Sequence, residues 1–431
     1  MYIDKIVPKA FQSYINSTVI ENIETLNLKK VTFTITKEEA LEDLRIFKYI
    51  MDNAYSGREY WENHGIYFKN IYCNIQTYIN SHELIYKQEL FNLYIKQLQD
   101  IHDGHLGLLT HKDRVYFGEK YKAYFADILL RKHKDKFEVI FSKEPRLTVS
   151  TIFTSQQLEG KLFRTLSPTG EEHFLLGCRS WNEINKLTLS FDGETISLPV
   201  HPCRATDYEQ DQDGIFLRSK IDGVNVVTST RFWEWDDKIA EDFYNCGLSL
   251  RNESTLIWNL MGNGGGNSNY PLQFIKGLNE YSYWKIDCAV LSSPAIKQIQ
   301  GLPLEKIQNK REWVFWNAEE RDVNKGTFEG TLYVLSNDNI ASSSEAALNI
   351  AQSVKNCVIV GQNSSGVGVF GDVLTYQLPY SDIQMRVPYK LFLGGANEGE
   401  GFEPDFWIDS INVQGELIAW LKDPDNYLAL K

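Results

Sequence analysis

Residues 331–361, with the sequence TLYVLSNDNIASSSEAALNIAQSVKNCVIVG, decide the fold class of this chain. Apolar residues dominate 331–335 and 357–361, which predicts two buried strands, and the alanine-rich segment between them predicts a helix over 343–354. The same alternation precedes this stretch, with strands expected at 224–228, 255–261 and 286–291 and helices near 236–248 and 271–278. The pattern predicts an α/β domain over 213–431 with a mainly parallel sheet, in which functional groups lie at the carboxyl ends of the strands.

The two regions before this domain have different patterns. Thr36 and Glu39 have capping-box spacing at the start of a helix expected over 36–54, whose apolar face contains Leu41, Leu44, Phe47 and Met51. A second helix is expected over 83–102, with one side formed by Leu84, Gln88, Phe91, Ile95, Leu98 and His102. We therefore expect a helical N-terminal domain over 1–112. Short runs rich in Val, Ile, Phe and Thr then predict a β-rich middle region over 113–212.

Length, charge and cysteine usage exclude several classes of protein. A chain of 431 residues, 43% of them hydrophobic, is expected to form two or three globular domains. Its net charge of −13, with no dense Lys/Arg cluster, argues against nucleic-acid binding. The six cysteines form no CxxC pair, so neither a zinc site nor a disulfide framework is expected. Without a signal-peptide pattern or a long apolar run we expect a cytoplasmic protein with no membrane span, although a removed leader would leave no trace.

Two glycine-rich turns follow predicted strands, GNGGGN at 262–267 and SGVGVFG at 365–371. The second turn matches the dinucleotide pattern GxGxxG, but residues 372–376 continue as a strand where a nucleotide site needs a helix. We therefore expect no nucleotide and no other cofactor. The triple glycine of the first turn keeps side chains away from its backbone amides, which could then hold a developing oxyanion. The alternative is a tight turn that only needs positive φ.

The serine run ASSSE at 341–345 lies between a predicted strand and a predicted helix, where serine is usually a helix cap. Its Ser342-Ser343-Ser344-Glu345 resembles the Ser-Ala-Ser-Glu signature of the tail-specific and C-terminal-processing proteases, the superfamily that includes the core of the tricorn protease. The segments at 256–266 and 398–405 resemble, in the same order, that family's Asp-Leu-Arg-x-Asn-x-Gly-Gly and Glu-x-x-Gly-Val-x-Pro-Asp motifs. The resemblance implies a ClpP/crotonase-like core with Ser342 as nucleophile and an oxyanion hole formed by the amides of Gly265, Gly266 and Ser343.

The resemblance covers about 214–410 and a short stretch near 100–109. It leaves 113–212 unmatched, and no PDZ module is recognised there. Within the matched part, Asn259 and Met261 replace the Asp and Arg of the family's strand. These replacements imply either a different set of residues bracing the turn or a fold kept after catalysis was lost.

A serine hydroxyl needs a general base, because it is a weak nucleophile at neutral pH. The bacterial processing proteases use a lysine 25 residues after the serine, and that position is Val367 here; the nearest lysines, Lys355 and Lys390, are not in the matching turn. The tricorn-like branch uses a histidine, and Asp103-Gly104-His105 resembles its motif, although Gly104 stands where a serine often precedes the histidine. The resemblance implies His105 as base, with His102 as the weaker alternative, and Glu398 as its orienting carboxylate, with Glu400 as the alternative.

The function expected from these residues is a serine peptidase acting on peptide or protein substrates. One alternative is a catalytically inactive ligand- or peptide-binding protein on the same fold, in line with the altered residues Asn259, Met261 and Val367. The other is an esterase or amidase acting on small molecules. The sequence makes no prediction of the oligomeric state.

Overall fold

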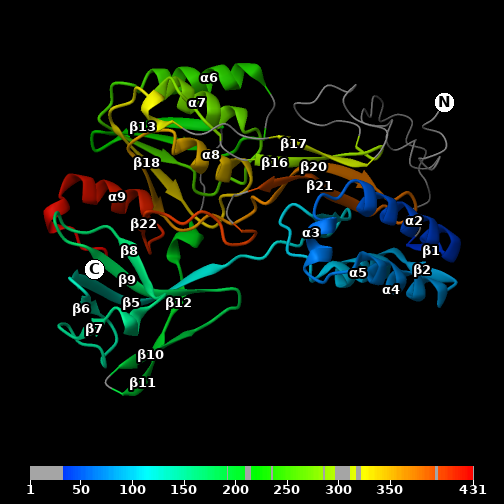
Figure 1. Ribbon diagram of the computed structural model, residues 1–431, viewed down its shortest axis with the longest axis horizontal. Helices are drawn as coiled ribbons and strands as arrows, with labels where there is room; N and C mark the ends of the chain where they lie inside the picture. Colours follow the sequence, from blue (N-terminus) through cyan, green and yellow to red (C-terminus); the bar gives the residue numbers. More distant parts are fainter. Residues whose placement is uncertain are drawn as a thin grey trace. The chain divides into compact units, whose positions relative to one another are not determined.

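The computed structural model describes residues 33–191, 193–208, 215–233, 236–284, 287–296, 311–316, 322–393 and 397–430 (Figure 1). The chain divides into two compact units, each built from three segments. Unit 1 comprises Met1–Glu119, Ile286–Ala318 and Val369–Glu398, and unit 2 comprises Lys120–Lys285, Glu319–Gly368 and Gly399–Lys431. The region 213–431 thus contributes to both units, and the division into domains at 112 and 212 stays a prediction about the sequence.

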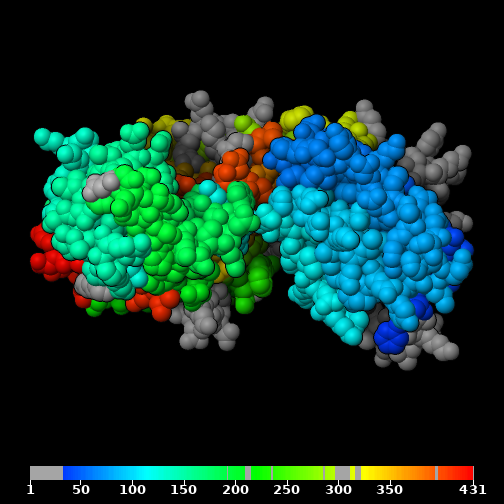
Figure 2. All heavy atoms as spheres, turned by 90° about the horizontal axis from the view of Figure 1, so that it is seen from below, coloured from blue at the N-terminus to red at the C-terminus, as the bar shows by residue number. Residues whose placement is uncertain are grey.

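Unit 1 combines short helices with an antiparallel sheet around one hydrophobic core. Its helices are α2 (Lys37–Asn53), α3 (Arg58–Asn63), α4 (Phe68–Asn80) and α5 (Lys87–Leu98), and their surface is part of the blue region in Figure 2. Strand β1 (Thr34–Thr36) pairs with β2 (Leu84–Tyr86). The larger sheet has the order β17-β16-β21-β3-β4, with β20 beside β21. Its strands are β3 (Gly107–Leu109), β4 (Arg114–Tyr116), β16 (Asp287–Ser292), β17 (Glu312–Trp316), β20 (Phe370–Gln377) and β21 (Gln384–Leu393).

The first predicted helix is confirmed, and the second is shorter than predicted. At the start of α2, Glu39 Oε2 accepts the Thr36 amide at 2.8 Å and Thr36 Oγ1 accepts the Glu39 amide at 3.3 Å, which is the predicted capping box. The helix expected over 83–102 is α5, which begins at Lys87 and ends at Leu98. Leu84 belongs to β2 instead and is 62% exposed, because the strand turns it outward.

Unit 2 contains the sheet that residues 331–361 predict, with the order β13-β14-β15-β18-β19-β22. Its five strands β14, β15, β18, β19 and β22 pair in parallel, and β13 is antiparallel to β14. The strands are β13 (Phe216–Ile221), β14 (Val224–Ser229), β15 (Thr255–Asn259), β18 (Thr331–Ser336), β19 (Cys357–Gly361) and β22 (Phe406–Trp407). A mainly parallel sheet is correct for this part only. The pairings of β16, β17, β20 and β21, which come from the same sequence region, are antiparallel, and a short connection joins β20 to β21 where a parallel pair would need a crossover.

Both faces of the unit 2 sheet are covered. Val227, Leu256 and Trp258 point to the core shared with the helices α6 (Asp237–Leu248), α7 (Asn269–Asn279) and α8 (Ser343–Ala351). Their neighbours in the strands, Val226 and Ile257, point to a second core shared with α9 (Val413–Lys422) and with strands of the β-rich region. Successive strand residues therefore alternate between two cores, which explains why these strands are continuously hydrophobic.

The β-rich region has the sheet order β7-β6-β5-β9-β8, with β12 beside β5, and a separate β10–β11 hairpin. Its strands are β5 (Lys122–His133), β6 (Lys136–Ser142), β7 (Ile152–Thr154), β8 (Leu162–Thr165), β9 (His173–Ser180), β10 (Lys186–Phe191), β11 (Glu194–Pro199) and β12 (His201–Pro202). Short 3₁₀ helices lie at Gln156–Leu158, Arg204–Asp207, Val323–Lys325 and Pro424–Asn426.

Candidate active site

Three neighbouring strands bring the candidate nucleophile and its surroundings together. Strands β15, β18 and β19 are adjacent and parallel, so their carboxyl ends lie at one edge of the sheet. The turn 262–267 follows β15, the loop 337–342 follows β18 and the turn 362–368 follows β19. Gly266 of the glycine turn and Ser343 of the serine run, which are 77 residues apart in the chain, are hydrogen-bonded neighbours in unit 2 for this reason.

Ser342 has an unusual backbone conformation. It lies immediately before α8 with φ 56° and ψ −120°, a region that residues other than glycine rarely adopt. Ser342 and Glu345 form a capping box, but an ordinary serine cap has an extended backbone, from which Ser342 departs. A conformation of this kind costs about 1–3 kcal/mol and persists only where the surroundings fix it, which happens preferentially at functional sites.

Of the three serines in the run, Ser342 alone is partly exposed. Ser343 and Ser344 are buried, and the Ser343 hydroxyl donates to the Gly266 carbonyl at 2.6 Å. Ser268 Oγ in turn donates to Ser343 Oγ at 2.9 Å. Ser343 therefore ties the glycine turn to α8, and its hydroxyl is already in use.

The glycine turn packs directly against Ser342. Gly265 has φ 99°, and a Cβ at this position would lie 2.7 Å from the Ala341 carbonyl oxygen and 2.9 Å from Ser342 Cβ. A Cβ on Gly266, at φ 135°, would collide with the Phe232 carbonyl. Both positions thus need glycine for conformation and for space.

The backbone amides around Ser342 are not equally available. Gly265 donates its amide to Asn263 Oδ1 at 3.0 Å, and Ser342 donates its amide to Glu345 Oε2 at 3.2 Å. The hydrogen bonds of the described residues include none from the amides of Gly266 or Ser343. Of the three amides predicted for an oxyanion hole, those of Gly266 and Ser343 therefore remain available to donate a hydrogen bond to a ligand.

His105 lies in a tight turn of unit 1 that Asp103 organises. Asp103 is fully buried, and its Oδ1 accepts the amides of His105 at 2.8 Å and Leu106 at 3.1 Å. Its Oδ2 accepts the Tyr55 hydroxyl at 2.9 Å, and Trp61 Nε1 donates to that hydroxyl at 2.9 Å. The sequence motif contained Asp103, but its role in holding the histidine's backbone could not be predicted from the motif.

Burial controls the protonation of this turn. The pKa of His105 is lowered from 6.5 to about 4, chiefly by burial and further by the positive charge of Arg386. Its imidazole is therefore neutral at neutral pH, the state that a general base requires. Burial also raises the pKa of Asp103 to about 6, against the lowering effect of its hydrogen bonds to Tyr55 and to the backbone.

Glu398 contacts the same turn. Its Oε1 accepts the Gly104 amide at 3.0 Å and its Oε2 accepts the Val369 amide at 3.0 Å. Glu398 thus fixes the residue next to His105 in unit 1. Glu400, the alternative, belongs to unit 2, where Arg179 and Asn363 donate to its backbone carbonyl.

The other candidate bases have different surroundings. His102 Nδ1 lies 3.4 Å from Glu119 Oε2, and its side chain is 41% exposed, so its nearest charged neighbour is a carboxylate at the surface of unit 1. Lys390 is buried in unit 1 and forms an ion pair with Asp372. Lys355 is exposed in unit 2 between α8 and β19.

The two departures from the family's strand are both buried. Asn259 Oδ1 accepts the Met261 amide at 3.0 Å, and its Nδ2 donates to Gln414 Oε1 at 3.2 Å and to the Tyr208 hydroxyl at 3.4 Å. Met261 is 1% exposed and belongs to the core beneath the sheet. Asn259 therefore braces the start of the glycine turn with neutral hydrogen bonds.

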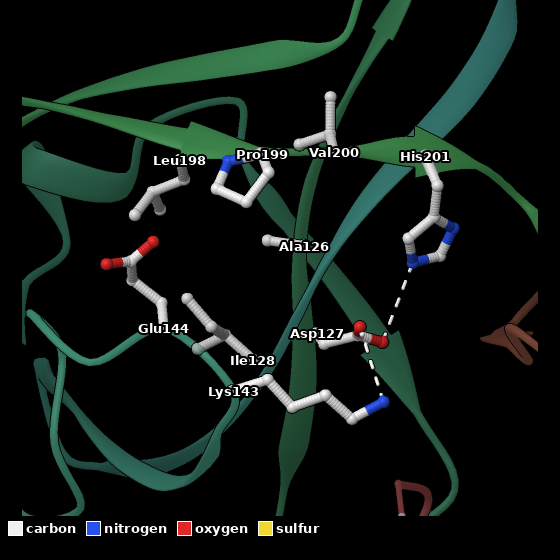
Figure 3. A pocket seen from close by; sticks show the side chains of 9 residues that line it. All are labelled: Ala126, Asp127, Ile128, Lys143, Glu144, Leu198, Pro199, Val200 and His201. Carbon is white, nitrogen blue, oxygen red and sulfur yellow. Dashed lines mark hydrogen bonds and ion pairs between the residues drawn. The ribbon is translucent and has the colours of Figure 1, made fainter.

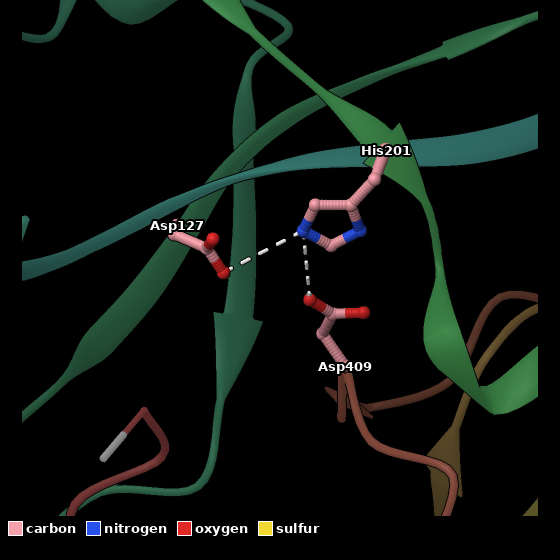
Figure 4. Close-up of side chains that lie close together, drawn as sticks. All are labelled: Asp127, His201 and Asp409. Atoms are coloured by element: carbon pink, nitrogen blue, oxygen red, sulfur yellow. Dashed lines mark ion pairs between the residues drawn. The ribbon is translucent and has the colours of Figure 1, made fainter. Parts of the chain in front are cut away.

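A second polar cluster in unit 2 could not be predicted from the sequence, because its members are far apart in the chain and form no motif. His201 Nε2 lies 3.6 Å from Asp127 Oδ1 and 3.6 Å from Asp409 Oδ2 (Figure 4). These three atoms are close enough to hold a metal ion. However, Arg204 donates to the same two oxygens, at 2.9 Å to Asp127 and 2.8 Å to Asp409, so a fixed cation already neutralises them.

Asp127 and His201 also line a pocket of about 220 Å³ in the β-rich region (Figure 3). Lys143 points toward Asp127, with Nζ 3.4 Å from Oδ2. The rest of the wall is largely apolar and contains Ala126, Ile128, Leu198, Pro199 and Val200. The remaining charged residue of the wall, Glu144, accepts a bond from Arg146 at 2.7 Å, so each carboxylate of the wall has a basic partner.

Known proteins were compared with the chain. No protein-family model matches the sequence, and no curated protein matches it. Among solved structures, mature CPAF is 12% identical, with 92% of this chain and 99% of that chain covered and a TM-score of 0.49. The photosystem II D1 C-terminal processing protease is 13% identical, covers 87% and 94%, and has a TM-score of 0.38; the tricorn protease is 12% identical, covers 86% and 34%, and also scores 0.38.

No helix in the described ranges has both the length and the apolar character needed to cross a membrane.

Proposed function

We propose that the chain is a serine peptidase with Ser342 as its nucleophile. The observation that carries the proposal is the strained backbone of Ser342, at φ 56° and ψ −120° at the junction of a strand-end loop and a helix. A sharp turn of this kind exposes a nucleophile and places backbone amides next to it. The partly exposed Ser342 and the buried Ser343 and Ser344 support the choice among the three serines.

In the proposed reaction, Ser342 Oγ attacks the carbonyl carbon of the scissile bond and His105 accepts the hydroxyl proton. His105 then donates this proton to the leaving amine, and water hydrolyses the acyl-enzyme. The amides of Gly266 and Ser343 bind the oxyanion. The lack of a side chain at Gly265 lets the turn approach the serine, while its own amide stays bound to Asn263.

The pairing of His105 and Glu398 with Ser342 is part of the proposal, because these residues belong to different units. It is supported by the Asp103-Gly104-His105 motif, by the neutral imidazole that burial favours, and by the contact of Glu398 with the histidine turn. In this proposal the chain belongs to the tricorn-like branch of the C-terminal-processing proteases, with a ClpP/crotonase-like core, and His105 replaces the lysine whose position is occupied by Val367 here. Its substrates would then be peptides or proteins.

Labelling with a fluorophosphonate probe tests the nucleophile. We expect the intact chain to be labelled at neutral pH and the Ser342→Ala variant to remain unlabelled, with Ser344→Ala labelled like the parent as a matched control. No labelling of the folded parent, or equal labelling of Ser342→Ala, would exclude the proposal.

A second candidate function is a ligand- or peptide-binding protein that has lost catalysis. The absence of a lysine at Val367 and the neutral bracing by Asn259 favour it. A peptide-library digest distinguishes the two functions, because the binding protein would retain peptides without cleaving them. Ester hydrolysis without any peptide cleavage would instead identify an esterase.

A further inference from the structure

Glu345 is the most heavily used buried acceptor next to Ser342. It is 2% exposed, and its two carboxylate oxygens accept hydrogen bonds from both sides of the candidate site. Oε2 accepts the Ser342 amide at 3.2 Å. Oε1 accepts the Ser364 hydroxyl at 2.6 Å and the Gly366 amide at 2.8 Å. One side chain therefore links the strained serine to the turn that follows β19.

This linked turn contains Val367, the position where the lysine-dependent relatives place their base. Burial raises the pKa of the Glu345 carboxyl, and the hydrogen bonds from Ser364 and from the backbone of Gly366, Ser342 and Val367 oppose this by stabilising the carboxylate. A side chain that accepts from the backbone of both segments fixes their separation. In this chain, the turn is thus held to Ser342 through its backbone, with no lysine.

The acceptors of Glu345 also explain how the strain at Ser342 is maintained. Ser342 directly precedes α8, so its amide has no acceptor in the helical ladder and needs one elsewhere. Glu345 Oε2 supplies it, while the Ser342 carbonyl accepts the amides of Glu345 at 2.9 Å and Ala346 at 3.0 Å. Both the amide and the carbonyl of Ser342 are therefore hydrogen-bonded. Loss of the Glu345 carboxylate, the acceptor of the amide, would allow the Ser342 backbone to relax toward ordinary cap geometry.

We propose, resting on the proposed function, that Glu345 is a positioning residue that keeps Ser342 in its reactive conformation. A carboxylate suits this task because it only accepts, and three donors converge on it. Glutamine would retain a single acceptor oxygen and would point an NH₂ group at N–H or O–H donors. Glu345→Gln therefore conserves shape and removes the acceptor pattern.

The test measures how fast Ser342 reacts with a fluorophosphonate over a range of probe concentrations. We expect Glu345→Gln to lower the maximal labelling rate by about 10–100-fold, because a shift of about 1 Å in a reacting group costs up to about 100-fold. The probe concentration for half-maximal rate should change little, since Glu345 contacts the backbone of the site. A merely structural role would lower the thermal midpoint or the labelled fraction and leave the rate of the folded protein unchanged.

Glu39→Gln is the matched control, because Glu39 forms the same glutamate-to-cap bond at the start of α2, in unit 1. It should be labelled at the parental rate. If Glu345→Gln does not fold, Ser364→Ala removes one donor of the same network, and a smaller loss of rate is expected. A folded Glu345→Gln variant, or in its absence a folded Ser364→Ala variant, that reacts at the parental rate overturns the positioning role alone. A parent that is not labelled at Ser342 overturns the proposed function.

Discussion

Substitution of Gly265 by alanine is the sharpest test of how the glycine turn supports Ser342. The new Cβ would lie 2.7 Å from the Ala341 carbonyl oxygen, 2.9 Å from Ser342 Cβ and 3.0 Å from the Ser343 amide nitrogen. The turn and the serine loop would have to separate by roughly 0.8 Å to reach the ~3.5 Å of ordinary contact. In addition, alanine at φ 99° is strained, at a cost of about 1–2 kcal/mol.

These two effects give the expected magnitudes. Overpacking of a tight contact costs about 1–3 kcal/mol, so the combined destabilisation is about 2–5 kcal/mol. For a unit of this size that corresponds to a thermal midpoint lower by at least about 4 °C. A displacement near 1 Å at the nucleophile would also reduce the rate of fluorophosphonate labelling by up to about 100-fold.

Gly264→Ala is the matched control in the neighbouring position. A Cβ on Gly264 would have its nearest neighbour, Trp233, at 4.0 Å, and we expect this variant to fold and react like the parent. Thermal unfolding and labelling rates are measured on all three proteins. If Gly265→Ala matched Gly264→Ala in both measurements, the turn and the serine would not be in the tight contact from which these magnitudes are calculated.

Since burial lowers the pKa of His105 to about 4, its neutral form persists as the pH falls below 6.5, and the labelling rate should decline only toward pH 4; a midpoint at or above 6.5 would contradict this role. Tyr55→Phe removes the hydroxyl that Asp103 Oδ2 and Trp61 Nε1 share. Each of these two buried groups left unsatisfied should lower the free energy of unfolding of unit 1 by about 1–3 kcal/mol, measured by chemical unfolding. An unchanged free energy of unfolding would show that this network does not stabilise the unit. In calorimetric titration with Zn²⁺, we expect no tight binding by the parent at the cluster of Asp127, His201 and Asp409. Arg204→Gln should bind Zn²⁺ there, because the substitution removes the cation that neutralises the two carboxylates. Tight binding by the parent at this cluster would be the contrary result.

The local parts of the fold were predictable from the sequence. The apolar runs at 331–335 and 357–361 correspond to β18 (Thr331–Ser336) and β19 (Cys357–Gly361), because strands buried on both faces need continuous apolar residues. The α2 cap was predictable because Thr36 and Glu39 interact within one turn. The pairing of β21 with β3 was not, because no local pattern marks partners that are more than 270 residues apart.

The site divides in the same way. Its residue types could be read from the sequence, since the glycine turn and the serine run follow neighbouring strands. The left-handed φ of Ser342 and the three donors on Glu345 arise only when the ends of β15, β18 and β19 are assembled. The cluster of Asp127, His201 and Asp409 had no signal at all, because its residues belong to strand β5, strand β12 and the segment after β22.

The strain at Ser342 also bears on the choice between an active peptidase and an inactive binding protein. A positive φ at a serine costs about 1–3 kcal/mol, which is a large share of the stability of a typical domain. Strain of this size is typically kept at active sites, ligand clamps and switch regions, and small changes in the loop would otherwise remove it. Here the strain is instead fixed from three sides, by the bare backbone of Gly265, by the Ser343 bond to Gly266 and by the carboxylate of Glu345. Residues that converge to hold one unfavourable conformation are expected where that conformation is used, as the proposed attack by Ser342 requires.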